Sequence, residues 1–318
     1  MGDDVEGRYE IVDVIGADGA LRRAWDREDG GYVMATLVPA GEADAWRRGF
    51  EQARVIDHPH VLTPTDWVDG DGEALVVTPL VEGETLADLI ADRGPLDPWW
   101  VKALAGQLLE ALEAVHADGG VHGALAPAHV WVEATATGTP TVRLSGFGAE
   151  PTPGYVAPEA LAGAGPEPRQ DLYAVGLCLI DLLTGRVRQV WDELTIPEGP
   201  LAEALARLVA ERPEDRDASA GEARWDLAAV AVAPALGRRL DVRSRLRPLP
   251  KGWGADGPGG RPVPSVKASK PARGPKTGPN AVETLIADLR DRLDPVLAAT
   301  IVLAVLGVIL LIAAFLTW

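Results

Sequence analysis

Cysteine and histidine, the side chains that most often bind transition metals, are few in this sequence: there are one cysteine and five histidines. The single cysteine, Cys178, excludes an intrachain disulfide and a cysteine metal cluster, and its apolar neighbours are typical of a buried helix. His58, His60, His116 and His129 lack the spacing of metal ligands. The sequence therefore predicts no metal site, so any chemistry must come from a different arrangement of residues.

The elements that would position such an arrangement begin with strands. Apolar and polar residues alternate at 9–15 and 32–38 around turn signals, and 75–78 is another short apolar strand. Longer helical patterns follow these strands along the chain. The first 236 residues are therefore predicted to form one domain of α+β architecture, with a β-rich front lobe, an α-rich back lobe and a cleft between them.

The predicted helices have clear start and stop signals. Asp97 and Pro98 are a good N-cap and first-turn pair, and apolar residues follow them at helical spacing. Gly185 is a fitting residue just past the end of a second, strongly apolar helix. Further helices are expected over 201–210 and 221–232.

Eight short segments, in this order and spacing, resemble the protein kinase family. They match, in turn, the strand before the glycine-rich loop, the turn after helix αC, the hinge, the catalytic loop, the Asp-Phe-Gly and Ala-Pro-Glu motifs, the start of helix αF and a late arginine-bearing segment. They are Arg8–Gly16, His58–Pro59, Leu80–Leu86, Val121–His129, Ser145–Gly148, Gly154–Glu159, Asp171–Gly176 and Arg212–Arg216. The resemblance covers most of residues 8–236 and implies the bilobal fold of bacterial Ser/Thr protein kinases.

The same resemblance implies where phosphoryl transfer should be carried out, and five of those positions hold other side chains. Thr36 replaces the strand lysine that holds the phosphates, and Ala126 replaces a second lysine. Ala124 replaces the aspartate that accepts the substrate proton. His129 and Gly146 replace the asparagine and aspartate that bind Mg²⁺. Phosphoryl transfer depends on positioning and charge neutralisation, so its loss is predicted.

Nucleotide binding is a separate question, because an adenine pocket needs mainly apolar walls and hinge backbone. The residues expected near an ATP cleft are Gly16, Gly19, Ala35, Thr78 and Leu80. Asp18 in the glycine-rich loop would repel phosphates. The carboxylate of helix αC is either Glu51 or lost at Gly49, and it has no lysine partner in either case. No cofactor is therefore expected, with ATP bound without Mg²⁺ as the alternative.

The positions that hold a kinase fold together are retained. The resemblance implies that His122 and Phe147 pack between the lobes and that Glu159 and Arg216 form a buried ion pair. Asp171 is expected to accept backbone N–H groups of the catalytic loop. Since fold-holding residues remain where chemistry-bearing residues are gone, the pattern predicts a pseudokinase with a maintained role.

The last 82 residues differ in composition from the domain. Residues 237–280 are rich in Pro and Gly and hold eleven Lys/Arg against two Asp, which predicts a disordered linker. Residues 281–294 can form a short amphipathic helix. Residues 295–318 are predicted to form a transmembrane helix, because the stretch from Val296 to Leu316 is uncharged and about 31 Å long as a helix.

Charge predicts the location and excludes one class of partner. The net charge is −17 although the linker is basic, so the domain is acidic and is not expected to bind nucleic acid. No N-terminal signal peptide is expected. The basic stretch before the apolar segment predicts a single-pass protein of the plasma membrane, with the N-terminal domain in the cytoplasm and the C-terminus outside. The linker either provides this topogenic signal or binds anionic lipids.

The leading functional hypothesis is a membrane-anchored pseudokinase that acts as a scaffold or allosteric regulator of other proteins. Its expected partners include active kinases and phosphopeptide-binding domains, the latter if Ser265, Ser269 or Thr277 is phosphorylated. The alternatives are a nucleotide-binding switch and a weakly active Ser/Thr protein kinase with atypical ATP binding.

Overall fold

The computed structural model describes residues 4–5, 7–15, 19–70, 72–117, 119–135, 138–190, 192–235 and 239–259. Contacts divide the chain into two units, Met1–Arg261 and Pro262–Trp318, and the second lies outside the described residues. The segments predicted to be amphipathic (281–294) and transmembrane (295–318) therefore also lie outside them. Within the described part, no helix is long and apolar enough to cross a membrane.

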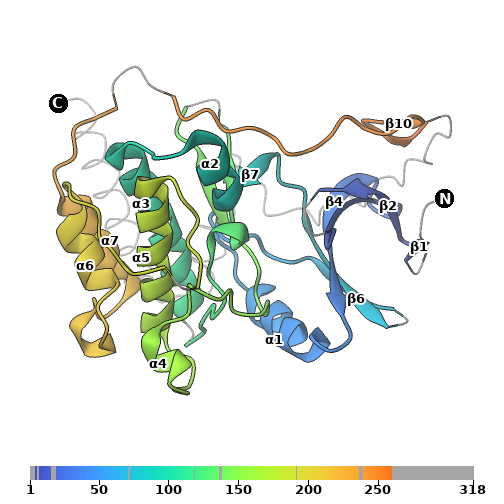
Figure 1. Cartoon of the computed structure of the whole chain (residues 1–318). Helices are drawn as coiled ribbons and strands as arrows, with labels where there is room; N and C mark the ends of the chain where they lie inside the picture. Colours follow the sequence, from blue (N-terminus) through green and yellow to red (C-terminus); the bar gives the residue numbers. More distant parts are fainter. Residues whose placement is uncertain are drawn as a thin grey trace, which may run out of the picture. The chain divides into compact units, whose positions relative to one another are not determined.

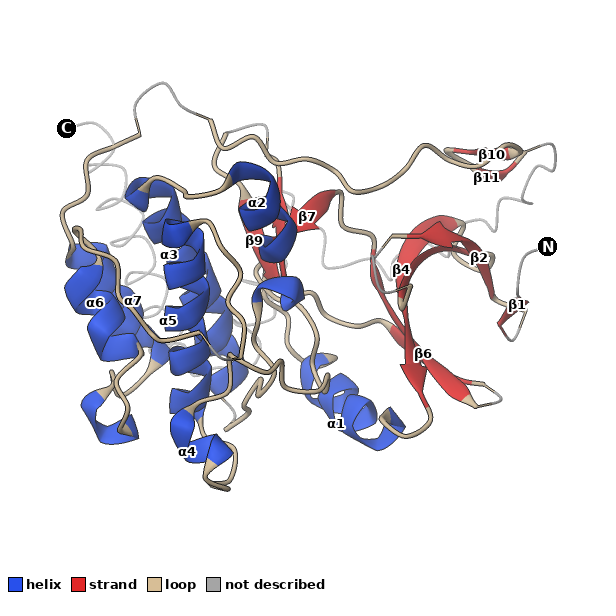
Figure 2. Ribbon diagram, in the orientation of Figure 1, coloured by secondary structure: helices blue, strands red, loops and turns tan. Residues whose placement is uncertain are grey.

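The N-terminal lobe consists of a six-stranded antiparallel sheet and one helix (Figures 1 and 2). The strand order across the sheet is β1-β2-β3-β4-β6-β5. Valine-rich β4 and β6 pair at its centre, where β-branched side chains suit a pleated, buried surface. The elements are β1 (Asp4–Val5), β2 (Tyr9–Val14), β3 (Leu21–Asp26), β4 (Gly31–Pro39), α1 (Ala43–Ala53), β5 (Asp66–Asp69) and β6 (Glu73–Pro79).

Alternation along β4 sends neighbouring side chains to opposite faces of this sheet. Ala35 packs on one face in a cluster that includes Tyr9. Met34 lies on the other face, in a cluster with residues of the hinge and the C-terminal lobe. Val38, also on that second face, shares a cluster with Phe50 of α1. The second face therefore both anchors α1 and borders the cleft.

Helices dominate the C-terminal lobe, as Figure 2 shows, and surround one large apolar core. A small three-stranded sheet, in the order β7-β8-β9, lies beside them. The α+β bilobal kinase-like fold predicted from the sequence is confirmed. The elements are β7 (Gly83–Thr85), α2 (Leu86–Arg93), α3 (Pro98–His116), η1 (Pro127–His129), β8 (Val130–Glu133), β9 (Thr141–Leu144), α4 (Pro158–Leu161), α5 (Pro168–Thr184), α6 (Ala202–Leu208), η2 (Pro213–Asp215) and α7 (Ala220–Ala229).

Helix ends in this lobe follow local sequence signals. The carboxylate of Asp97 accepts a hydrogen bond from the Trp99 backbone N–H at the start of α3, as the sequence predicts. Thr85 forms a capping box with Asp88 at the start of α2. Gly185 ends α5 in a left-handed conformation, φ 69°, which glycine adopts without strain. Helix α5 is buried over most of its length, so its position anchors the segments around it.

Residues 239–259, here named the C-terminal strap, differ from the sequence-based expectation. They lie in the segment predicted to be a disordered linker, but they run along the domain to a small hairpin of β10 (Trp253–Gly254) and β11 (Gly257–Pro258), drawn in orange in Figure 1. Leu240 and Val242 pack against the core of the C-terminal lobe. The expectation of disorder is wrong for the strap, because composition does not show contacts with distant residues.

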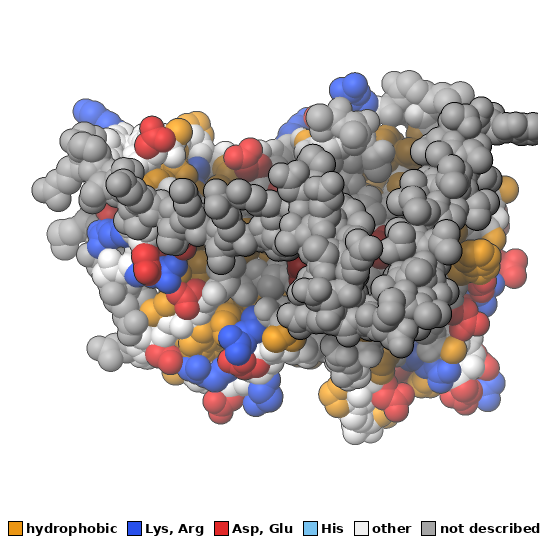
Figure 3. All heavy atoms as spheres, turned by 180° about the vertical axis from the view of Figure 1, so that it is seen from behind, with side chains coloured by type: hydrophobic (Ala, Val, Ile, Leu, Met, Phe, Trp, Pro, Cys, Tyr) orange, Lys and Arg blue, Asp and Glu red, His pale blue; other side chains and the backbone are white. Residues whose placement is uncertain are grey.

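Charged side chains of both signs are interspersed on the uncovered part of the face in Figure 3. Exposed ion pairs also occur among the described residues, such as Arg224 with Glu113 at 2.7 Å. Such exposed pairs contribute about 0–1 kcal/mol each. The arrangement of the lobes therefore depends mainly on the buried clusters and on a few buried polar contacts.

Candidate functional site

The segment that matches a catalytic loop, residues 121–129, is held by one buried carboxylate. Asp171 of α5 accepts hydrogen bonds from the backbone N–H groups of His122 and Gly123, each at 2.8 Å. The Nε2 atom of His116 also lies 2.8 Å from this carboxylate. A buried carboxylate is stable only when its oxygens are hydrogen-bonded, and here three groups provide those bonds. These hydrogen bonds fix the loop backbone to α5.

His122 joins this loop to the segment that matches Asp-Phe-Gly, residues 145–148. Its Nε2 donates to the Ser145 carbonyl at 2.8 Å, and its ring centroid is 4.7 Å from that of Phe147. Burial lowers the pKa of His122 to about 4, so the ring is neutral near pH 7. Both rings are buried between the lobes, which makes this contact structural.

Glu159 of α4 and Arg216, directly after η2, form a bidentate ion pair. The guanidinium donates to the two carboxylate oxygens at 2.6 and 2.8 Å, and the Arg216 side chain is 0% exposed. Burial acts to raise the pKa of Glu159, but the hydrogen bonds from Arg216 outweigh it and leave the pKa lowered. Arg216 also donates to three backbone carbonyls, so its charge is well satisfied.

The positions expected to carry out phosphoryl transfer lie together, but other contacts occupy them. Ala124 and Ala126 are buried, and each offers only a methyl group. The Nδ1 atom of His129 is 2.7 Å from the Ala124 carbonyl oxygen. Gly146 has φ 83°, and a Cβ added there would lie 2.6 Å from Cγ of His129. The histidine ring therefore fills the space that a metal-binding side chain at position 146 would need.

Helix α1 approaches the same segment too closely to carry a glutamate there. Gly49 faces the backbone of Phe147 and Gly148, and a Cβ added at Gly49 would lie closer than 3.0 Å to atoms of both. Glu51, the other candidate, is exposed and pairs with Arg54 at 2.6 Å. The position that faces the cleft is thus Gly49, where no side chain fits.

The apolar part of the cleft is filled by side chains from both lobes. Met34 of β4 and Trp131 of β8 are 2% and 5% exposed, and they belong to one buried cluster with Leu62 and Val81. Three partly buried hydrophobic residues pack against this cluster: Ile15 after β2, Leu21 at the start of β3, and Leu80 at the hinge. In kinases, adenine lies between the lobes against the hinge. A methionine and a tryptophan occupy the corresponding part of this chain.

The residues expected near an ATP cleft are not all brought together. Leu80 packs on the cleft cluster, and Thr78 pairs with Met34 across β6 and β4. Ala35 packs on the opposite face of the sheet, away from the cleft. Gly19 has φ 78° and open space around it. Gly16 and Asp18 lie outside the described residues.

The fit of ATP and Mg²⁺ to this site is poor. Thr36 is paired with Leu21 and Val76 on the neighbouring strands and has no charge to offer a phosphate. Within the described ranges there is no group of three or more His, Cys, Asp or Glu side chains placed to hold a metal. The residues that would bind the metal and phosphates of ATP are therefore not present in the described part of the cleft, and no phosphoryl-transfer step can be derived.

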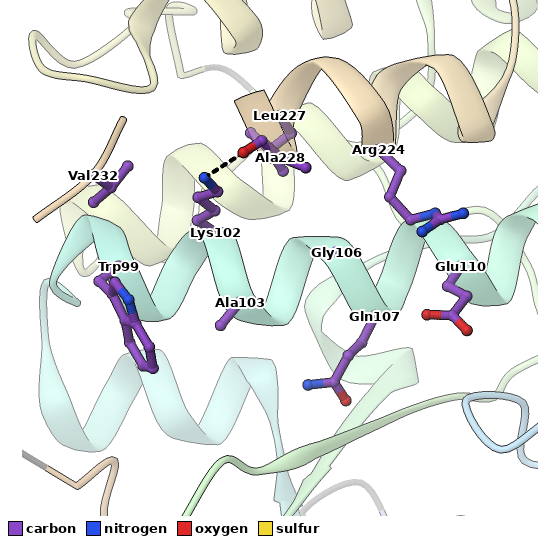
Figure 4. A pocket seen from close by; sticks show the side chains of 10 residues that line it. All are labelled: Trp99, Lys102, Ala103, Gly106, Gln107, Glu110, Arg224, Leu227, Ala228 and Val232. Carbon is purple, nitrogen blue, oxygen red and sulfur yellow. Dashed lines mark hydrogen bonds between the residues drawn. The ribbon is translucent and has the colours of Figure 1, made fainter. Parts of the chain in front are cut away.

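A hollow of about 390 Å³ lies elsewhere, between α3 and α7 of the C-terminal lobe (Figure 4). It is lined mainly by apolar groups, together with the polar side chains of Gln107 and Glu110. Lys102 at its edge donates to the backbone carbonyls of Ala228 and Val230, at 2.8 and 2.6 Å. This lysine therefore ties α3 to the end of α7.

The burial of Met34 and Trp131 in the cleft does not follow from local sequence patterns, although their positions give a signal. Met34 lies two residues before Thr36, and Trp131 lies two residues after His129. Both are large side chains next to positions already assigned to the cleft. The two side chains bury each other only when the lobes pack together, and local sequence patterns do not show how the lobes pack.

The geometry defines a bilobal domain of the protein-kinase fold. Residues 19–195 match the protein kinase domain family, which is more than half of the chain. The chain therefore belongs to the protein kinase family.

Named relatives are bacterial Ser/Thr protein kinases. PkaA of Streptomyces coelicolor is 30% identical over 271 residues, which are 69% of this chain and 49% of that protein. PknI of Mycobacterium tuberculosis is 30% identical over 250 residues, 71% of this chain and 43% of that protein. The crystal structure of the PknI kinase domain has a TM-score of 0.62 at 25% identity and covers 70% of this chain and 96% of that domain. The chain spans less than half of the length of these relatives.

Proposed function

We propose that this chain is a pseudokinase, in which a kinase domain binds and regulates other proteins without transferring phosphate. The observation that carries the proposal is the packing of the degenerate site. The His129 ring packs against Gly146 and leaves no room there for a metal-binding aspartate. At Gly49, the backbone of Phe147 and Gly148 leaves no room for the glutamate of the helix. Restoring one catalytic residue would therefore not restore a working site.

Electrostatics supports the same conclusion. A transferring phosphoryl group develops charge that a kinase neutralises with cations and metal ions, while a carboxylate accepts the proton of the attacking hydroxyl. Thr36, Ala124 and Ala126 supply neither charge nor a proton acceptor. General-base loss alone costs about 10²–10⁴ in rate, and here the cation and metal ligands are replaced as well.

The packing of the cleft favours a scaffold over the alternative of a nucleotide-binding switch. Adenine would have to displace Met34 and Trp131, which are buried against each other and the hinge. Moving a buried side chain into water exposes its apolar surface, at a cost of about 1.5–3 kcal/mol for a methionine. That cost would subtract from any affinity for nucleotide.

A membrane anchor is part of this proposal, and its support comes from the sequence. The uncharged run within 295–318 has the length of a membrane span, and the basic residues before it favour a cytoplasmic domain. A single-pass anchor would place the domain at the inner face of the plasma membrane. There it would act on other proteins, including active kinases, and phosphorylated Ser265, Ser269 or Thr277 could recruit a phosphopeptide-binding domain.

Phosphotransfer assays on the full-length chain test the proposal. The purified protein in detergent is incubated with labelled ATP and Mg²⁺ or Mn²⁺, alone and with a general protein substrate. No incorporation above that of a heat-unfolded sample is expected. Stoichiometric phosphate on the chain, mapped to its own Ser or Thr residues and unaffected by further purification, would contradict the proposal.

A further inference from the structure

The C-terminal strap contacts the C-terminal lobe through its backbone. The Arg245 backbone N–H donates to the Gly83 carbonyl at 2.9 Å, which continues the edge of the small sheet beside β7. Close by, Arg93 of α2 donates from Nε to the Asp241 carbonyl at 3.0 Å. Backbone hydrogen bonds of this kind fix the position of a chain segment as well as its presence.

One buried carboxylate makes this contact specific. Glu84 of β7 is 0% exposed, and its oxygens accept hydrogen bonds from the Arg243 backbone N–H at 2.8 Å and from Nη2 of Arg245 at 3.1 Å. Among the described residues outside the strap, Nη2 of Arg93 also donates a hydrogen bond to Glu84, at 3.4 Å. A buried carboxylate is costly unless it is paired and hydrogen-bonded, so the strap completes a site that the rest of the domain leaves partly unsatisfied.

The far end of the strap contacts the N-terminal lobe. Arg23 of β3 donates from Nη2 to the Arg247 carbonyl at 3.0 Å. The Tyr32 hydroxyl of β4 donates to the Gly254 carbonyl at 2.6 Å, and the ring of Trp253 lies 6.3 Å from that of Tyr32.

A close approach at the hairpin explains a glycine. Gly257 has φ 94°, and a Cβ added there would lie 2.6 Å from the Trp25 ring. Trp25 is itself buried and meets Tyr32 edge-on at 4.9 Å. The hairpin therefore rests directly on an aromatic pair of the N-terminal lobe, where a side chain at position 257 would not fit.

From these contacts we propose that the C-terminal strap is an intramolecular clamp that holds the two lobes in one orientation. The strap is bound to the C-terminal lobe at Glu84 and to the N-terminal lobe at Tyr32, so relative rotation of the lobes would break one of the two attachments. The clamp acts without nucleotide, and it stands whether or not the cleft binds ATP. The strap is followed in sequence by residues 260–318. Binding or modification of those residues that released the strap would therefore change the arrangement of the lobes.

The experiment uses two matched arginine variants of the full-length chain in detergent. In Arg245→Ala, the strap loses its ion pairs with Glu84 and with Asp92 of α2. In Arg247→Ala, a residue two positions further along loses a side chain that is exposed and has no ion pair among the described residues, while its backbone carbonyl remains. Tyr32→Phe is a milder third variant, since it removes only the hydroxyl bonded to Gly254.

Hydrogen exchange followed by mass spectrometry reports whether the strap is bound. Peptides covering 243–254 should exchange slowly in the unmodified protein and in Arg247→Ala. They should exchange about tenfold faster or more in Arg245→Ala, because a hydrogen-bonded charge pair at a buried carboxylate is lost. Tyr32→Phe should show the same change, smaller and concentrated near residue 254.

Spin labels report whether the strap clamps the lobes. Glu28 and Glu203 are exposed residues of the two lobes, and each is replaced by cysteine for labelling. Cys178 is buried, and burial raises the pKa of its thiol, so it should stay unlabelled. A narrow distance distribution is expected in the unmodified protein and in Arg247→Ala, and a broader one in Arg245→Ala. Fast exchange of the strap in the unmodified protein would overturn the proposal, as would a released strap with an unchanged distance distribution.

Discussion

Replacement of Gly49 by alanine tests the closeness of helix α1 to the backbone of Phe147 and Gly148. The added Cβ would lie closer than 3.0 Å to backbone atoms of both residues, and backbone cannot rotate away as a side chain can. The helix must therefore move outward by roughly 1 Å to reach ordinary contact distances. Overpacking of this kind costs about 1–3 kcal/mol, and the better helix propensity of alanine returns up to about 1 kcal/mol. A net loss of about 1–2 kcal/mol is expected.

Gly106 is the matched control, because it also lies inside a helix, α3, and has no atom within 4 Å of an added Cβ. Gly106→Ala should stabilise the domain by about 0.5–1 kcal/mol through helix propensity alone.

The two variants should therefore differ by about 1.5–3 kcal/mol, or roughly 3–12 °C in Tm for a domain of this size. Thermal unfolding of the full-length chain, followed by circular dichroism, measures the difference. Equal Tm values would refute the close contact, and with it the explanation for the missing helix carboxylate.

Three further predictions concern buried groups. Glu159→Ala should cost about 3–5 kcal/mol in urea unfolding, because it leaves the Arg216 charge buried without its partner; Glu214→Ala, on an exposed side chain, should change little. Stability should fall as the pH drops from about 6.5 towards 4, by up to about 3 kcal/mol from His122, since the unfolded state binds a proton in that range and the folded state does not; the slope of unfolding free energy against pH should be smaller in His122→Phe. Trp131→Ala should cost about 3–5 kcal/mol in the same urea assay, because it empties the cleft cluster; a cost below about 1 kcal/mol would mean that the tryptophan does not fill the cleft.

Much of the fold could be predicted from the sequence because its signals are local. Asp97 before Pro98 specifies the start of α3, and Gly185 specifies the end of α5, whatever the rest of the chain does. The order of such elements, with the short motifs between them, was sufficient for the two-lobe architecture. The substitutions at Ala124 and Gly146 could also be identified from position alone, because the motifs around them were intact.

Other features of the site required contacts between distant residues. Met34 and Trp131 are almost a hundred residues apart and become neighbours only when the lobes pack together. Whether Glu51 or Gly49 stands at the position of the αC glutamate depends on which side of α1 faces the cleft, and the sequence alone does not show this. The strap was missed for a similar reason: its composition is that of a linker, and Glu84, which binds it, lies far away in the sequence.

A thermal-unfolding titration of the full-length chain with ATP, with and without Mg²⁺, tests the central claim most directly. A ligand that binds the folded state must raise the Tm, by an amount equivalent to about 2.7 kcal/mol at a hundred times its Kd. If side chains fill the cleft and its metal ligands are lost, millimolar ATP should leave the Tm unchanged in both conditions. A saturable rise in Tm with ATP would contradict the account, and a larger rise with Mg²⁺ than without it would contradict the loss of the metal site as well.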